Sequence, residues 1–95
     1  MNYIVSITPK ALLDISEAIE YYNLKAKDLG FKFADDVEDN INEITILPKG
    51  YTIKYKNVRG KILNKFPFII LYTFHEELNS IEIIRIFNTN QNPFW

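Results

Sequence analysis

The feature that most constrains the fold is a nearly unbroken apolar run from Phe68 to Phe74. Its length is that of a single strand. Because apolar side chains occur on both faces of the run, we expect this strand at the centre of a sheet, between other strands and under a layer of helices. The rest of the chain must supply those neighbours and that layer.

Two amphipathic helices precede the run. Thr8 and Pro9 predict a helix start, as an N-cap residue followed by proline at the first helical position. The first helix is predicted from Pro9 to Leu29, and Gly30 is predicted to end it. Its apolar stripe consists of Leu12, Ile15, Ile19, Tyr22, Ala26 and Leu29.

The second helix is expected to follow almost at once and to end at Pro48 to Gly50. The short connection predicts an antiparallel helical hairpin. The apolar stripe of this helix consists of Phe33, Val37, Ile41 and Ile44. An acidic group is expected near its start, where acids complement the helix dipole. This group comprises Asp35, Asp36, Glu38 and Asp39, and without histidine or a fixed loop it does not predict a metal site.

The remaining strands follow the second helix. Tyr51 to Val58 is predicted as a strand, Arg59-Gly60 as a bend, and Lys61 to Phe66 as a continuation of the same ribbon. After the central run, a polar turn leads to a last strand from Ile81 to Phe87.

An opening strand is expected before the helices, because Tyr3, Val5 and Ile7 alternate with other residues. Residues 1–95 are therefore predicted to form one α+β domain. It comprises an N-terminal strand, an antiparallel helical hairpin, and a three- to four-stranded, mostly antiparallel sheet with the helices on one face. The other face is expected to be more open.

Composition limits the chemistry. The chain has no cysteine, which excludes disulfides, thiolate metal sites and a cysteine nucleophile. The first ten residues do not resemble a signal peptide. The longest apolar run, Phe66 to Tyr72, is too short to cross a membrane. A cytoplasmic protein without membrane attachment, metal or cofactor is expected.

Charge is unevenly distributed. Residues 1–43 hold nine acids and four bases, whereas residues 44–75 hold six bases and no acid. The basic block comprises Lys49, Lys54, Lys56, Arg59, Lys61 and Lys65. Such a block indicates either an anionic partner or a solvated strand whose lysines guard a sheet edge.

Several strings in this order resemble the RelE/ParE toxin superfamily, in particular its ParE-like branch. The resemblance covers nearly the whole chain. It rests on Tyr3 to Ala11, Ile19 to Tyr22, Val58 to Lys61, Lys65 to Tyr72, and Ile86 to Trp95. The resemblance implies the fold predicted above.

The departures from the superfamily bear on mechanism. RNA-cleaving members have a basic residue in the middle of the central strand and another just after the final strand. Here these positions correspond to Ile69 and to Asn90 or Gln91, and Asn88 stands where the ParE-like branch often has histidine. Asparagine and glutamine can hydrogen-bond phosphate but supply neither charge nor a proton. The resemblance therefore favours inhibition by binding over enzymatic cleavage.

The resemblance implies the toxin of a type II toxin–antitoxin module, of the plasmid stabilisation type, neutralised by a cognate antitoxin. Inhibition of DNA gyrase by binding is the leading mechanism. Two alternatives stay open, namely a ribosome-dependent mRNA endonuclease and a non-toxic interaction module or co-repressor. Self-association stays open as well.

The predicted contact residues belong to the basic block, the last strand or the tail. They are Lys56, Arg59, Lys61, Lys65, Arg85, Asn88, Gln91 and Trp95. Lys54, Arg59 and Lys61 are the candidate catalytic residues if the chain cleaves RNA. Because Arg59 and Lys61 flank Gly60, their side chains are expected on one face of the ribbon.

For the other polar and aromatic residues, the sequence predicts structural positions. Tyr55 and Tyr72 are expected in the core or at a sheet edge, and His75 on the surface. Arg85 is expected either to pair with a helix acid such as Glu20 or to reach the open face. Trp95 is expected to pack over the sheet edge.

Overall fold

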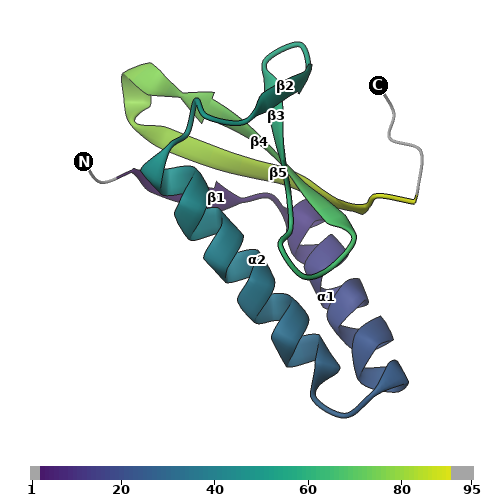
Figure 1. The fold of residues 1–95 in the computed structure, drawn as a ribbon. Coiled ribbons are helices and arrows are strands. Elements are labelled where there is room, and N and C mark those ends of the chain that lie inside the picture. The colour runs from purple at the N-terminus through teal and green to yellow at the C-terminus, as the bar shows by residue number, and fades with distance from the viewer. Residues whose placement is uncertain (1–2, 91–95) are drawn as a thin grey trace.

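The apolar run forms β4 (Phe68–His75), the central strand of a five-stranded sheet (Figure 1). The computed structural model describes residues 3–90. The strand order is β1-β5-β4-β3-β2. The other strands are β1 (Ile4–Ile7), β2 (Thr52–Tyr55), β3 (Val58–Ile62) and β5 (Ser80–Asn88). The β1–β5 pair is parallel and the other pairs are antiparallel, so the predicted α+β architecture is confirmed with β1 as a fifth strand.

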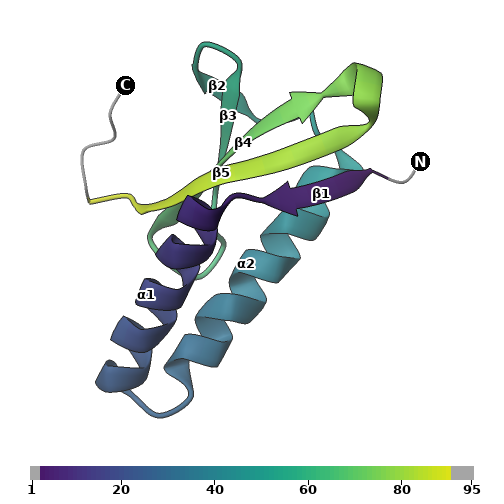
Figure 2. The ribbon, with the colours of Figure 1, turned by 180° about the vertical axis from the view of Figure 1, so that it is seen from behind.

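Two antiparallel helices, α1 (Pro9–Lys25) and α2 (Leu29–Ile46), cover one face of the sheet (Figures 1 and 2). The side chain of Thr8 caps α1 by accepting a hydrogen bond from the Ala11 amide at 3.1 Å, as predicted. Neither described helix is long and apolar enough to cross a bilayer.

The helix boundary at Gly30 differs from the prediction. The first helix ends at Lys25, and Gly30 lies in the first turn of α2. Asp28, with φ of 63°, reverses the chain instead. Glycine is required for contact between the helices, because a Cβ atom there would lie 2.5 Å from the Ile19 carbonyl oxygen. Its amide donates a 2.8 Å hydrogen bond to Asn23 Oδ1.

The predicted continuous ribbon is instead a hairpin. The chain turns at Lys56 and Asn57, with Lys56 at φ of 50°, and Arg59-Gly60 lies within β3. β3 ends at Ile62, so Lys61 to Phe66 does not continue as a strand. The turn contains neither glycine nor proline, which explains why the sequence pattern placed the bend later.

Apolar side chains fill both faces of the sheet. On the helix side, the rings of Tyr22, Phe33, Phe66 and Phe68 contact one another, with centroids 4.8 Å apart for Tyr22 and Phe66. On the opposite side, which we call the open face, a smaller cluster lies between β3, β4 and β5. It consists of Val58, Ile69 and Leu71, with Ile84 and Phe87 packed against them.

Candidate functional site

The basic block is divided between the two faces of the sheet. In β3, Arg59 pairs with Tyr72 and Lys61 pairs with Ile70 of β4. Both partners belong to the helix-side core. Arg59 and Lys61 therefore share a face, as the sequence predicted, but that face is covered by helices.

Lys61 is buried between β3 and α2, with only 8% of its side chain exposed. Its ammonium group donates to Asn40 Oδ1 and lies 3.3 Å from Glu43 Oε2. It also lies 5.2 Å from the centre of the Tyr51 ring. A cation held in this way cannot reach RNA or a protein target without leaving the core, so we remove Lys61 from the candidate contact and catalytic residues.

Asp36 extends this buried polar group. It is 2% exposed, and its carboxylate accepts hydrogen bonds from Asn40 Nδ2 at 3.0 Å and from the Lys65 amide at 2.8 Å. The sequence assigned Asp36 to an acidic group near the start of its helix. That assignment is wrong, because α2 starts at Leu29 and Asp36 faces the sheet.

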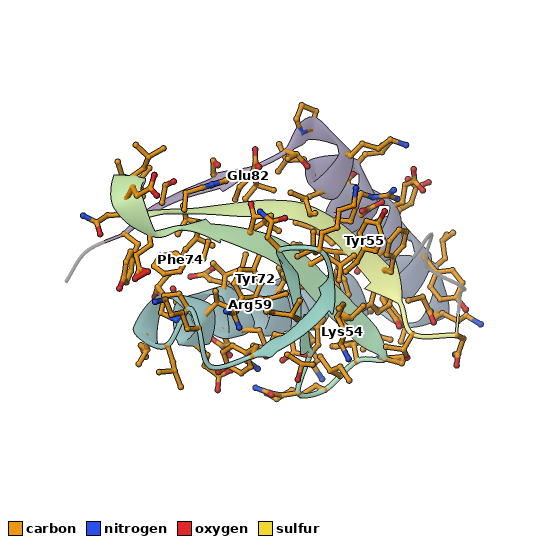
Figure 3. The ribbon with its side chains drawn as sticks, turned by 90° about the horizontal axis from the view of Figure 1, so that it is seen from above. Lys54, Tyr55, Arg59, Tyr72, Phe74 and Glu82 are labelled. Carbon is orange, nitrogen blue, oxygen red and sulfur yellow. The ribbon has the colours of Figure 1, made fainter. Side chains whose placement is uncertain are left out.

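Arg59 holds the connection between α2 and β2. Its Nη1 donates to the carbonyl oxygens of Tyr51 at 2.8 Å and Lys49 at 3.2 Å. Tyr72 lies beside Arg59 in Figure 3. The Tyr72 hydroxyl donates to the Pro48 carbonyl oxygen at 2.7 Å, and burial raises the pKa of Tyr72 to about 12. The predicted core position of Tyr72 is confirmed.

We expect Tyr72→Phe to lower the free energy of unfolding by about 1–2 kcal/mol at neutral pH, because the buried Pro48 carbonyl loses its donor. Tyr21→Phe, at an exposed ring, is the control. Urea unfolding measures both. Equal stability of the two variants would contradict the structural role of the hydroxyl.

The difference in free energy of unfolding between the parent chain and Tyr72→Phe should also depend on pH. Because the folded-state pKa of Tyr72 is raised, its hydroxyl stabilises the fold fully below the unfolded-state pKa of about 10. This contribution is lost as the pH rises from about 10 to about 12. The stability difference should narrow over that interval, and a constant difference would exclude the raised pKa.

Arg85 pairs with an acid of α1, but the acid is Asp14 and not Glu20. Its Nε and Nη2 atoms lie 2.8 and 3.0 Å from the Asp14 carboxylate oxygens, and its guanidinium lies 4.3 Å from the centre of the Phe87 ring. The hydrogen bonds that Arg85 donates to Asp14 raise the pKa of Arg85. Sequence reasoning missed this role of Asp14, because 71 residues separate the partners.

The β2–β3 hairpin carries exposed cations beside the open face. Lys54 and Tyr55 lie on this hairpin, which is nearest to the viewer in Figure 3. A Cβ atom on Gly60 would lie 3.0 Å from Lys54 Cγ and 2.7 Å from Ile69 Cδ1, so the Lys54 stem passes over Gly60 close to the apolar cluster. Lys56 is exposed, and its ammonium group lies 5.3 Å from the centre of the Tyr55 ring.

Ile69 belongs to the apolar floor of the open face and is 9% exposed. The polar groups of this face lie further along β4 and β5. Thr73 Oγ1 is 3.2 Å from His75 Nε2, and Glu82 pairs with Thr73 across the strands. Because His75 and Ile69 are six residues apart, they are separated by about 20 Å along the strand. The imidazole therefore lies far along β4 from Ile69, the floor residue beside the Lys54 stem.

The other predicted contact residues lie apart from the hairpin. Lys65 is exposed in the loop between β3 and β4. Asn88 ends β5, and its Oδ1 accepts a hydrogen bond from the Asn90 amide at 2.8 Å. Gln91 and Trp95 lie outside the described residues. His75 is exposed, as predicted.

Comparisons with known proteins agree with this arrangement. A family model described as the ParE toxin of the type II toxin–antitoxin system parDE matches residues 5–93. No curated protein matches the sequence.

Solved structures share the fold. A chain of the chromosomal ParDE system from P. aeruginosa is 19% identical, with a TM-score of 0.78 over 90% of this chain and 95% of that chain. The isolated E. coli RelE toxin is 12% identical, with a TM-score of 0.71 over 96% and 88%. The intact E. coli RelBE complex contains a chain that is 12% identical, with a TM-score of 0.69 over 90% and 94%. With the family match spanning nearly its whole length, the chain belongs to the ParE toxin family of type II toxin–antitoxin systems.

Proposed function

We propose that this chain is the toxin of a type II toxin–antitoxin module and acts by binding its target, with DNA gyrase as the expected target. The observation that carries this proposal is the open face, where Ile69 lies in an apolar floor beside Lys54, on a hairpin that also carries the exposed Lys56. An apolar floor beside cations suits a protein surface with apolar and acidic groups.

RNA cleavage is less well supported. It requires a cation for the developing phosphorane charge together with groups that move protons. Arg59 and Lys61 are engaged on the helix side of the sheet. His75 lies about 20 Å along β4 from the floor residue Ile69. Inhibition by binding therefore fits this arrangement better than RNA cleavage, because it does not require Arg59, Lys61 or His75 to move.

A cognate antitoxin is the proposed partner. The similar E. coli RelBE structure is a toxin–antitoxin complex, and the P. aeruginosa ParDE structure is described as a toxin–antitoxin system. We propose that the antitoxin is encoded in the adjacent reading frame, that both proteins act in the cytoplasm, and that the module stabilises the replicon that carries it.

The test combines two assays on the purified chain. Inhibition of gyrase supercoiling is expected, together with the absence of discrete cuts inside codons when translated mRNA is mapped by primer extension. Codon-specific cuts without gyrase inhibition would replace the proposal with the endonuclease. Tight binding to the neighbouring protein without toxicity would replace it with the interaction module.

We expect Lys54→Glu to weaken gyrase inhibition about tenfold, because it reverses a charge beside the apolar floor. Lys27→Glu, an equal charge change at an exposed position between the helices, is the control. Titration of the supercoiling assay with each variant gives the comparison. Equal inhibition by both variants would remove the hairpin from the target-binding surface.

A further inference from the structure

The outer edge of β5 is only partly covered by β1. The parallel pairing of the two strands ends with Ile7 opposite Ile83, whereas β5 continues to Asn88. Figure 2 shows β1 ending beside β5 while β5 runs on past the start of α1. The last third of β5 therefore has an edge that no strand of the described chain occupies.

Side chains from the start of α1 take the place of a strand at the beginning of this edge. Thr8 Oγ1 donates to the Ile84 carbonyl oxygen at 2.9 Å. Asp14 Oδ2 accepts from the Ile86 amide at 2.9 Å. Asp14 is the last of these two side chains along the edge, and the next backbone groups of β5 lie beyond it.

Strand geometry identifies those next groups. The Thr89 amide points toward β4, since it donates to the Pro67 carbonyl oxygen at 2.7 Å. Because alternate residues of a strand direct their backbone groups to opposite edges, the Ile86 carbonyl and the Asn88 amide point outward. The Ile86 carbonyl, an acceptor, and the Asn88 amide, a donor, thus follow one another on this edge. Their spacing is that of the backbone groups with which an added strand would pair.

These two groups face a groove of about 500 Å³ between α1 and β5. Asp14, Glu17 and Tyr21 line it from α1, and Arg85 and Asn88 from β5. Asp14 is paired with Arg85, whereas Glu17 is exposed and forms no ion pair within residues 3–90. The groove therefore carries an excess negative charge beside a 53% exposed tyrosine ring.

We infer that this groove binds an extended segment of the antitoxin, which pairs with the Ile86 carbonyl and the Asn88 amide and directs a lysine or arginine toward Glu17. An extended backbone satisfies both edge groups. A basic side chain balances Glu17. The inference rests on the proposed function, because it takes the antitoxin as the partner.

Other occupants fit the groove less well. Nucleic acid would place phosphates in a groove of excess negative charge, beside the exposed Glu17 carboxylate. A second copy of the chain, paired edge to edge through β5, would bring two grooves of the same charge together. Hydrogen exchange with DNA, or with the chain alone at high concentration, distinguishes these occupants from the antitoxin.

The test measures the affinity of the chain for the protein of the adjacent reading frame by calorimetry. Glu17→Lys is expected to weaken binding about tenfold, because an attractive pair becomes a repulsive one. Glu20→Lys makes the same charge change on an exposed position of α1 that does not line the groove, and a change below about twofold is expected there. High salt should reduce the difference between the two variants.

A second pair of variants tests the backbone contact. Proline at an outward-facing amide keeps the β4 side of the strand intact, so Asn88→Pro is expected to fold. Asn88→Pro should bind about tenfold more weakly than Asn88→Ala, which keeps the amide. Hydrogen exchange should show the Asn88 amide newly protected in the complex.

The outcomes separate the inference from the function on which it rests. Lack of a complex with the parent chain would overturn the proposed function and this inference together. A tight complex that tolerates both Glu17→Lys and Asn88→Pro would overturn the inference alone. Protection of the Asn88 amide by DNA, or by the chain itself at high concentration, would assign the edge to that occupant instead.

Discussion

Asp36→Ala is expected to destabilise the fold by about 3 kcal/mol, the largest effect of any exchange among the acids of α2. The carboxylate is buried and accepts from Asn40 and from the Lys65 amide. Its loss leaves the Lys65 amide without an acceptor and removes a negative charge from the group that holds Lys61. Urea unfolding, with the slope checked for two-state behaviour, measures the change.

The neighbouring acid is the matched control. Asp35 is exposed, so Asp35→Ala should change the free energy of unfolding by less than about 0.5 kcal/mol. Asp36→Asn keeps the shape but exchanges one acceptor oxygen for a donor group, so an intermediate loss is expected. Equal stability of the two alanine variants would mean that the buried polar group does not contribute to folding.

The same carboxylate connects α2 to the end of the sheet. Asp36 holds the loop between β3 and β4 through Lys65, and the Pro67 carbonyl oxygen of that loop accepts from both the amide and the hydroxyl of Thr89. Loss of Asp36 should therefore loosen the end of β5 as well. Faster hydrogen exchange of the Thr89 amide in Asp36→Ala would show this connection.

Local pattern was sufficient for the two helices, for the central strand and for the layer order. The apolar run of β4 required a central strand, and the helix stripes required a covered face. Gly30 shows the limit, because a glycine that permits contact between two helices looks in sequence like one that ends a helix. The distinction depends on Ile19 and Asn23, which no local pattern connects to Gly30.

The candidate site was less predictable for the same reason. Alternation places Arg59 and Lys61 on one face of β3 but does not say which face meets the helices. That choice follows from the register of β3 against β4, which the alternation within β3 does not set. The burial of Lys61 likewise depends on Asn40 and Glu43, polar residues whose position on α2 could be judged only after the true start of that helix was known.

Asp14→Ala is expected to cost about 3 kcal/mol, because this carboxylate accepts from three N–H groups. Two belong to Arg85 and one is the Ile86 amide. Glu17→Ala, one turn later on α1 and exposed, should change stability by less than about 0.5 kcal/mol. A double-mutant cycle with Arg85→Met should give a coupling energy of about 1–2 kcal/mol, since each single change removes the same ion pair.

Removal of the Asp14 side chain should also promote self-association of the chain. The Ile86 amide would then join the Ile86 carbonyl and the Asn88 amide on the edge that no strand of residues 3–90 occupies, and three successive edge groups pair with another strand more readily than two. Light scattering of folded Asp14→Ala should therefore show self-association at concentrations where Glu17→Ala stays at the parent mass. A destabilised Asp14→Ala that stays monodisperse would mean that Asp14 anchors α1 without protecting the edge. Additive energies in the double-mutant cycle with Arg85→Met would mean that the contribution of Asp14 to stability comes from the Ile86 amide and not from Arg85.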